Sequence, residues 1–382
     1  MTSWTDHTLL NPSAPIRFAI LGAGRMGLEH GHALMGLPEA QVVAVADPLP
    51  EAAARVARLT RAGAVYLDPH DAIRDPQVQA VIIVTPTSTH AALIGAAARA
   101  GKAIFCEKPV ASDLAETEQV MRVVQECGVP FQIGFQRRYD AGFAQARQRI
   151  LAGELGTIEQ FSATGRDPAP PPLAYLALSG GIFVDQAIHD LDMARFLVGE
   201  VEEVLAIGDA RVDPAIAGLG DADTTTVLLR FVNGAQGVVQ NSRRAVYGYD
   251  VRTEVFGSGG KFVLDATPRT PLLSYTQGVS MDHYQFFMDR FKDAYRAEIG
   301  AFVASLRAGT APQPGPFDAT ESLRLALACT RSLKEGRAVR VAEVQGDAEV
   351  HGDAEVQGEA EVHGDAEAQI NAAGGRTPAQ PT

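Results

Sequence analysis

The chain has few cysteines, no surplus of positive charge and no long apolar run. Its 382 residues include only three cysteines, Cys106, Cys127 and Cys329. A sparse, odd set without a Cys-x-x-Cys pair excludes a disulfide framework and a cysteine-based metal site. The longest apolar stretch, Val78–Val84, is far too short to cross a membrane, and Met1–Pro15 lacks the basic start and apolar core of a signal peptide. We therefore expect a cytoplasmic protein with no membrane partner.

Acidic residues outnumber basic ones by 46 to 33, which gives a net charge of −13. Because phosphate backbones are bound by a surplus of Lys and Arg, this balance argues against a nucleic-acid partner. Residues 341–382 hold nine acids and one arginine, so they carry −8 and the first 340 residues carry −5. This segment repeats units such as AEVQGD and AEVHGD. A six-residue period can indicate a β-helix, but one valine per copy buries too little surface to offset the ordering entropy, and we predict a disordered acidic tail.

Strands and helices alternate through the first part of the chain, whose length suggests two domains. Apolar runs typical of buried parallel strands occur at residues 16–22, 41–46, 78–84, 103–106 and 129–133. Helical patterns lie between these runs, and such regular alternation is typical of a doubly wound parallel sheet. We predict an α/β Rossmann domain over residues 16–134, preceded by an N-terminal extension over residues 1–15.

The pattern changes after Gly134. Helical patterns recur at residues 135–151, 181–197, 282–308 and 319–336. Between residues 201 and 265, four segments with alternating or β-branched residues are separated by Asn-Gly and Gly-Gly turns, which favour antiparallel pairing. We predict a second, α+β domain with a mostly antiparallel sheet over residues 135–340, which serves substrate binding and oligomerisation.

A glycine-rich turn lies between the first strand and the first helix. Its sequence, GAGRMG, matches Gly-x-Gly-x-x-Gly, in which the glycines allow a tight turn, close approach of a pyrophosphate and close packing of helix on strand. Asp47 follows 20 residues after Gly27, where a carboxylate would bind ribose hydroxyls and repel a 2′-phosphate. The alternative is a simple glycine turn with an Asp that caps a helix. We predict an NAD site that includes Gly22, Gly24, Arg25, Met26, Gly27 and Asp47.

Two further segments follow strands at the same edge of the predicted sheet. Thr and Ser residues after the third strong strand would line the cofactor crevice, although they are also common N-caps. In the segment Phe105–Pro109, Lys108 leaves a buried strand and could polarise a substrate oxygen, although a lone lysine is commonly a surface residue. The predicted cofactor contacts here are Thr85, Pro86, Thr87, His90, Glu107 and Lys108.

Asp185, His189 and Asp192 stand at i, i+4 and i+7 and would share one helix face. His189 could take a hydroxyl proton near neutral pH, and a neighbouring carboxylate could orient it. A metal site would need a further His or Cys nearby, and the sequence has none there, so we predict no metal. The alternative is an amphipathic helix with a structural histidine.

These motifs together resemble the Gfo/Idh/MocA oxidoreductase family over about residues 16–340. The resemblance rests on GAGRMG, on Glu107-Lys108-Pro109 and on the pattern GGxxxDxxxHxxD of residues 180–192. Within the family, the segments GFQRRYD (134–140), GRDPAPPP (165–172) and NSRRAVYGYD (241–250) are most similar to bacterial inositol 2-dehydrogenases.

The resemblance implies NAD-dependent oxidation of a secondary hydroxyl of myo-inositol, or of a close cyclic polyol, to the 2-keto product by a homo-oligomer, a tetramer or dimer. Lys108 would stabilise the developing alkoxide, and His189 would be the base with Asp185 as its partner. The other residues implied to contact the ring hydroxyls are Arg137, Asp167, Asp192, Tyr247 and Tyr249. On a strand the two tyrosines would share a face, which packing alone would also explain.

Three alternatives stay open from the residues. The first is another sugar or polyol dehydrogenase of this family, acting on glucose or scyllo-inositol. The second is an NAD-dependent glycosidase that oxidises, eliminates and re-reduces its substrate. The third is a non-catalytic NAD-binding sensor, against which the presence of Lys108, Asp185 and His189 together argues. The PAPPP segment and GFQRRYD favour a polyol over a glycoside, by resemblance.

Overall fold

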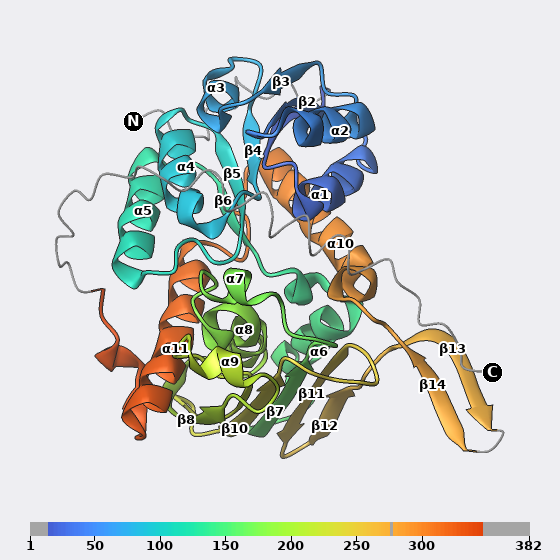
Figure 1. Ribbon diagram of the computed structural model, residues 1–382, viewed down its shortest axis with the longest axis vertical. Helices are drawn as coiled ribbons and strands as arrows, with labels where there is room; N and C mark the ends of the chain where they lie inside the picture. The colour runs from blue at the N-terminus through green and yellow to red at the C-terminus, as the bar shows by residue number, and fades with distance from the viewer. Residues whose placement is uncertain (1–13, 276–277, 347–382) are drawn as a thin grey trace.

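The first part of the chain forms a six-stranded parallel sheet in the order β3-β2-β1-β4-β5-β6 (Figure 1). The computed structural model describes residues 14–275 and 278–346. The strands are β1 (Ile16–Leu21), β2 (Ala40–Ala46), β3 (Ala64–Tyr66), β4 (Ala80–Ile83), β5 (Ala103–Glu107) and β6 (Phe131–Gly134). The helices between them are α1 (Arg25–Met35), α2 (Pro50–Thr60), α3 (Pro69–Arg74), α4 (Thr87–Arg99) and α5 (Leu114–Cys127). This strand order is that of a dinucleotide-binding Rossmann fold, which confirms the predicted doubly wound sheet.

The second sheet has seven strands in the order β12-β11-β7-β10-β9-β8-β15. Its strands are β7 (Ile158–Arg166), β8 (Val201–Asp209), β9 (Thr224–Phe231), β10 (Gln236–Ser242), β11 (Asp250–Gly257), β12 (Gly260–Leu264) and β15 (Val339–Arg340). Only the β7–β10 pairing is parallel, so the prediction of a mostly antiparallel sheet is confirmed.

One face of this sheet is covered by helices, among them α8 and α11 (Figure 1). The helical elements of this part are η1 (Gln136–Tyr139), α6 (Ala141–Leu151), α7 (Leu173–Leu176), η2 (Phe183–Ala187), α8 (Ile188–Leu197), α9 (Pro214–Ala217), α11 (Pro316–Glu335) and η3 (Val341–Glu343). Two predicted helices are therefore interrupted. The helix expected over residues 135–151 breaks at Asp140, whose side chain accepts from Gly142 N–H and starts α6. The helix expected over residues 181–197 begins with a π-helical turn, η2.

The sequence analysis missed a hairpin before the long C-terminal helices. β13 (Pro268–Tyr275) pairs with β14 (Val279–His283), and this hairpin projects from the body of the molecule (Figure 1). Helix α10 (Phe287–Ala308) therefore begins at Phe287 rather than at residue 282. A short, exposed two-stranded ribbon has no buried face, so it lacks the regular apolar alternation that predicts a strand.

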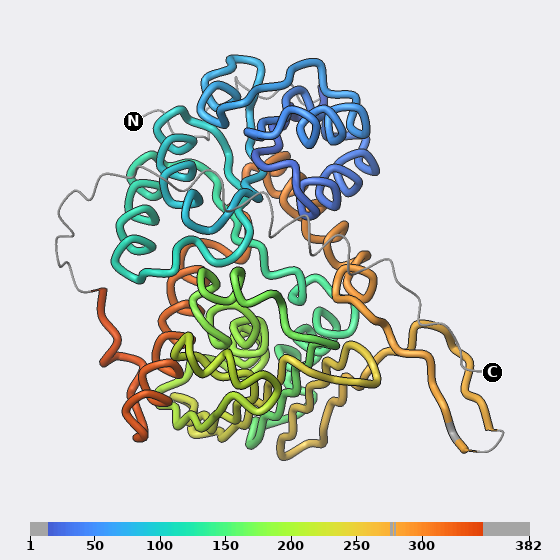
Figure 2. Tube along the Cα trace, in the orientation of Figure 1, coloured from blue at the N-terminus to red at the C-terminus, as the bar shows by residue number. Residues whose placement is uncertain are grey.

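Helix α10 returns to the first sheet and packs beside α1 (Figures 1 and 2). Ile299, Phe302 and Val303 lie in one apolar cluster with Phe18 and Ile20 of β1. The Rossmann sheet is thus covered partly by a segment that lies almost 300 residues along the chain. The division of the chain at residues 134/135 stays a prediction.

The described structure includes little of the two predicted termini. Residues 1–13 and 347–382 lie outside the described residues, and with them most of the predicted N-terminal extension and acidic tail. Val341 is buried, and Glu343 pairs with Arg337 at 2.8 Å, so the packed chain continues past the predicted boundary at residue 340. Among the described residues, the search for a helix long and apolar enough to cross a membrane finds none.

Candidate active site

The glycine-rich turn has the geometry of a phosphate cradle. Gly22 has φ +102°, and a Cβ there would lie 2.6 Å from the carbonyl oxygen of Val84. A Cβ on Gly27 would lie 2.2 Å from the carbonyl oxygen of Gly22. Helix α1 begins after Gly24 without a side-chain cap, so its first N–H groups are left for a phosphate. The backbone at this turn therefore fits a dinucleotide.

Asp47 lies directly against this turn. Its Oδ2 accepts a hydrogen bond from Ala23 N–H at 2.6 Å, and its Oδ1 accepts from Leu49 N–H at 2.8 Å. A carboxylate can accept more than two hydrogen bonds, so lone pairs remain for ribose hydroxyls. Arg55 also contacts this turn, because it donates a hydrogen bond to the carbonyl oxygen of Ala23 at 3.2 Å. The residues present thus fit NAD, as the sequence predicts.

Two residues predicted to contact the cofactor have other partners. His90 is buried, and its Nδ1 and Nε2 each lie 2.8 Å from a backbone carbonyl oxygen, those of Pro109 and Thr85. Both ring nitrogens are occupied, so the ring is placed to join two loops rather than to bind a ligand. Oε1 of Glu107 lies 2.7 Å from Nε2 of the buried His30 on α1, which is hydrogen-bond distance. Glu107 therefore connects the end of β5 to the helix that begins at the glycine turn.

Lys108 joins the end of β5 to the π-helical turn η2. Its Nζ donates to the backbone carbonyl oxygen of Asp185 at 2.6 Å, across 77 positions of sequence. Burial lowers the pKa of Lys108, and the negative charges of Asp185 and Glu107 oppose that effect. The predicted lysine is thus a half-buried side chain that contacts the turn carrying Asp185.

His189 is enclosed, and its Nδ1 has no hydrogen-bond partner among the described residues. The ring packs edge-on against Phe135, with the ring centroids 6.3 Å apart. Burial lowers its pKa well below the usual value, and the positive charges of Lys108 and Arg137 act in the same direction. A neutral imidazole with a free nitrogen can accept a proton, as a general base must.

The carboxylate of Asp185 is held by groups other than His189. Its Oδ1 accepts from Tyr175 O–H at 2.8 Å, and its Oδ2 accepts from Arg243 Nη1 at 2.8 Å. Neither residue was predicted. Arg243 lies 58 positions from Asp185, and only its place in the NSRRAVYGYD segment could have drawn attention to it.

Three of the residues implied to bind substrate lie in one buried polar group. Arg137 donates to Asp190 at 2.5 Å and to the hydroxyl of Tyr249 at 3.4 Å. Burial raises the pKa of Asp167 to about 7, with Asp185 adding to the rise and Arg243 and Arg137 opposing it. Arg137 and Asp185 thus act electrostatically on both Asp167 and Lys108, and Arg137 also acts on His189.

Asp192 is placed elsewhere. It is fully buried, and it accepts hydrogen bonds from Arg138 at 2.6 Å and 2.8 Å and from Ser322 at 2.9 Å. The expected common face with His189 therefore does not bring Asp192 to substrate, because its carboxylate already neutralises a buried guanidinium. These contacts come from η1 and α11, and the spacing on one helix cannot reveal them.

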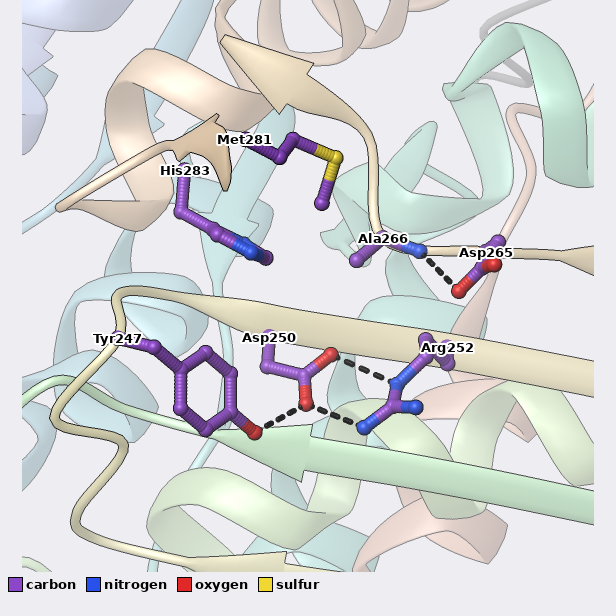
Figure 3. A pocket seen from close by; sticks show the side chains of 7 residues that line it. All are labelled: Tyr247, Asp250, Arg252, Asp265, Ala266, Met281 and His283. Carbon is purple, nitrogen blue, oxygen red and sulfur yellow. Dashed lines mark hydrogen bonds and ion pairs between the residues drawn. The ribbon is translucent and has the colours of Figure 1, made fainter. Parts of the chain in front are cut away.

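The two tyrosines do not share a strand face, so that expectation is wrong. They precede β11, and Gly248 between them has φ +121°. Tyr249 is consequently buried, whereas 44% of Tyr247 is exposed. Tyr247 donates to Asp250 at 2.6 Å at the edge of a cavity of about 250 Å³ (Figure 3). The residues that line this cavity are Tyr247, Asp250, Arg252, Asp265, Ala266, Met281 and His283, and none of them is a predicted catalytic residue.

No group of three or more metal-binding side chains occurs within residues 14–275 and 278–346.

Comparison with known proteins identifies the family. Residues 16–135 match the model of an oxidoreductase family with an NAD-binding Rossmann fold, and residues 143–263 match the model of the GFO/IDH/MocA C-terminal domain. The myo-inositol 2-dehydrogenase of Thermotoga maritima is 40% identical over 334 residues, which is 87% of this chain and 100% of that protein. The chain belongs to the Gfo/Idh/MocA oxidoreductase family.

Other members of the family point the same way. The inositol 2-dehydrogenase of Rhizobium meliloti is 41% identical over 330 residues, 86% of this chain and 99% of that protein. The crystal structure of scyllo-inositol dehydrogenase from Lactobacillus casei, with bound NAD(H) and scyllo-inositol, superposes with a TM-score of 0.80 at 28% identity. It covers 86% of this chain and 99% of its own. The first domain of this Gfo/Idh/MocA oxidoreductase is thus an NAD-binding Rossmann domain.

Proposed function

We propose that the protein is an NAD-dependent dehydrogenase that oxidises a secondary hydroxyl of myo-inositol, or of a close cyclic polyol, to the 2-keto product. The observation that carries this proposal is the contact of Lys108 Nζ with the Asp185 turn at 2.6 Å, directly before the helix that bears His189. This contact joins the edge of the NAD-binding sheet to the proposed base. The activities of the inositol dehydrogenases described above support the substrate class.

His189, Lys108 and Asp185 each have a separate role in the proposed reaction. Bound NAD supplies the acceptor for the hydride that leaves the carbinol carbon. His189 accepts the hydroxyl proton, because burial and two nearby cations keep its imidazole neutral. Lys108 donates a hydrogen bond to the oxygen as negative charge develops on it, and so lowers the barrier to forming the carbonyl. Asp185 positions this edge of the site through its backbone carbonyl and its carboxylate.

A neutral polyol fits the mixture of charges near these residues. Arg137 and Tyr249 supply donors, and Asp167 has a pKa of about 7, so its carboxyl can accept or donate near neutral pH. A ring with several hydroxyl groups needs donors and acceptors with little net charge. A strongly charged substrate would leave one sign of this set unmatched.

One assay tests the function. The protein is incubated with NAD and, separately, with inositols, aldoses and aryl glycosides, while NADH formation is followed. NADH formed with myo-inositol supports the proposal, and its absence with every inositol overturns it. Aglycone release from an aryl glycoside without net NADH would instead identify a glycosidase. NADH formed only with an aldose or with scyllo-inositol would assign a different substrate within the family.

We also propose that the protein is a homo-oligomer that pairs through the open face of the second sheet. Leu205 and Leu228 lie opposite each other on β8 and β9, and both are exposed, as is Val263 in the same cross-strand row. From Leu228 the row passes through Val238, Ser162 and Glu254 to Val263, so its continuous apolar part lies on β8, β9 and β10. An exposed apolar patch on a sheet face marks an interaction surface. Leu228→Glu should reduce the mass measured by light scattering, and an unchanged mass would contradict this interface.

Three free cysteines accord with a reducing cytoplasm, where we place the protein.

A further inference from the structure

Arg243 is a fully buried arginine in the loop that follows β10. Its Nη1 donates to Asp185 Oδ2 at 2.8 Å, and its Nη2 lies 3.8 Å from Asp221 Oδ2. Its Nε and Nη2 have no hydrogen-bond partner among the described residues. A guanidinium without solvent is costly unless carboxylates compensate its charge. Here one of the compensating carboxylates belongs to the proposed catalytic set.

We infer that Arg243 is a positioning residue for the proposed dehydrogenase reaction, and that it holds the Asp185 carboxylate in a fixed orientation one helical turn before His189. This inference rests on the proposed function. It assigns to Arg243 a role that acts through Asp185, since Arg243 donates to that carboxylate at 2.8 Å.

A second contact sets the position of the turn itself. Asp221 Oδ1 accepts from Ile182 N–H at 3.0 Å, at the start of the π-helical turn that carries Asp185. Gly181 has φ +85°, and a Cβ there would lie 3.0 Å from the same carboxylate oxygen, so the backbone approaches Asp221 closely. Arg243 therefore contacts both Asp185 and the carboxylate that anchors the turn before it.

Charged and titratable groups from several elements lie around this turn. They are Lys108 after β5, Arg137 in η1, Asp167 after β7, Tyr175 in α7, His189 in α8, Asp221 before β9 and Arg25 in α1. Arg243 opposes the rise in the pKa of Asp167 and of Tyr175. Removing its charge takes a cation away from the surroundings of Asp167 and His189, which favours the protonated forms of both groups.

Two substitutions separate charge from geometry. In Arg243→Gln the cation is lost, so the acid limb of the kcat/KM profile should move to higher pH by about one unit, and kcat should fall about tenfold or more. Arg243→Lys keeps the charge but cannot contact both carboxylates with a planar fork. It should lower kcat and leave the acid limb where the wild-type protein has it. NAD affinity should stay unchanged in both variants.

Arg195→Gln is the matched control. Arg195 is also buried and pairs with Glu200 at 2.8 Å, on the same helix as His189. Its loss should reduce thermal stability without moving the acid limb. If Arg243→Gln retains the wild-type limb and kcat, or if Arg243→Lys shifts the limb as Arg243→Gln does, the inference is overturned.

A titration without substrate separates this inference from the proposed function. Protein with isotope-labelled histidine is titrated by NMR, and the His189 signal is assigned by its loss in His189→Gln. The His189 midpoint should be higher in Arg243→Gln than in the wild-type protein and unchanged in Arg243→Lys. An unchanged midpoint in Arg243→Gln overturns the inference. If no polyol gives NADH, the proposed function fails, but this titration still decides the role of Arg243. If Arg243→Gln does not fold, Arg243→Lys is used alone, and a shifted His189 midpoint in that variant overturns the inference.

Discussion

At the scale of single residues, burial decides which groups can exchange protons. His189 is enclosed near Lys108 and Arg137, and both cations disfavour its protonated form. A base in this environment is already neutral at pH 7. The acid limb of the oxidation rate that reports His189 should accordingly lie below the ordinary histidine pKa of about 6.5.

His189→Ala and Lys108→Ala should each lower kcat about a hundredfold or more, because one removes the base and the other the donor to the alkoxide. NAD should still bind both variants, as measured by quenching of intrinsic fluorescence. Lys102→Ala is the control, since Lys102 precedes β5 at its other end and donates to the carbonyl oxygens of Asp75 and Val78. A full rate in either active-site variant would show that its role is misassigned.

Cofactor choice should depend on Asp47. Asp47→Ser removes the carboxylate that would repel a 2′-phosphate, and Arg55 already lies near the turn, 3.2 Å from the carbonyl oxygen of Ala23. We expect KM for NAD to rise about tenfold and turnover with NADP to become measurable. The steady-state constants for both cofactors check this. Unchanged discrimination would place the ribose elsewhere.

At the scale of elements, helix α10 carries an acidic side chain into the interior. Glu298 has no exposed surface, and neither carboxyl oxygen has a side-chain or backbone partner among the hydrogen bonds of the described residues. Burial and the nearby charge of Glu107 raise its pKa well above the usual value. The helix therefore buries, near Glu107 and Phe135, a carboxyl group whose protonated form is favoured more in the folded state than in the unfolded state.

This carboxyl makes stability depend on pH. A group with a raised pKa in the folded state contributes fully below its unfolded pKa, about 4.3, and loses that contribution as pH rises toward the folded pKa. Glu298→Gln is neutral throughout, so it should gain about 1–3 kcal/mol of unfolding free energy relative to wild type between pH 5 and pH 8. Urea unfolding at the two pH values measures this. Glu126→Gln, on the exposed face of α5, should show no such difference, and an equal response of both variants would refute the assignment.

At the scale of the whole molecule, the described residues up to Gly346 contact both parts of the fold. Arg324 donates to the carbonyl oxygen of Val344 at 2.5 Å and to Glu118 of α5 at 2.6 Å, so the last described residues contact two helices. Glu343 is also paired with Arg337. These contacts connect the end of the second domain to the NAD-binding domain.

Two truncations should therefore differ. A chain that ends at residue 346 keeps these contacts and should retain full activity, whereas one that ends at residue 340 loses Val341, Glu343 and Val344 and should unfold several degrees lower. Differential scanning calorimetry and the NADH assay compare them. Loss of activity in the chain that ends at residue 346 would show that the acidic segment takes part in function.

Local features of the sequence determined the NAD-binding half of the fold. Strands such as β1 and β4 are buried on both faces, so their sequences are largely apolar. They can therefore be recognised in the sequence without knowing which strands they pair with. The glycines of GAGRMG are required by backbone conformation and close contacts within a few residues. Asp47 and Lys108 follow strands directly, and parallel strands bring their carboxyl ends to one edge.

Only the tertiary structure decided the partners of the candidate catalytic residues. Arg243 pairs with Asp185, which is 58 positions away in the sequence, and Arg138 pairs with Asp192, which is 54 positions away. Helix α10, near the C-terminal end of the described chain, packs on β1. Such pairings depend on how separate elements pack, and periodicity within one element carries no information about its neighbours. The sequence alone therefore determined which groups the reaction could use, and the packing of separate elements, largely within the second domain, decided which of them are free to act and which are held.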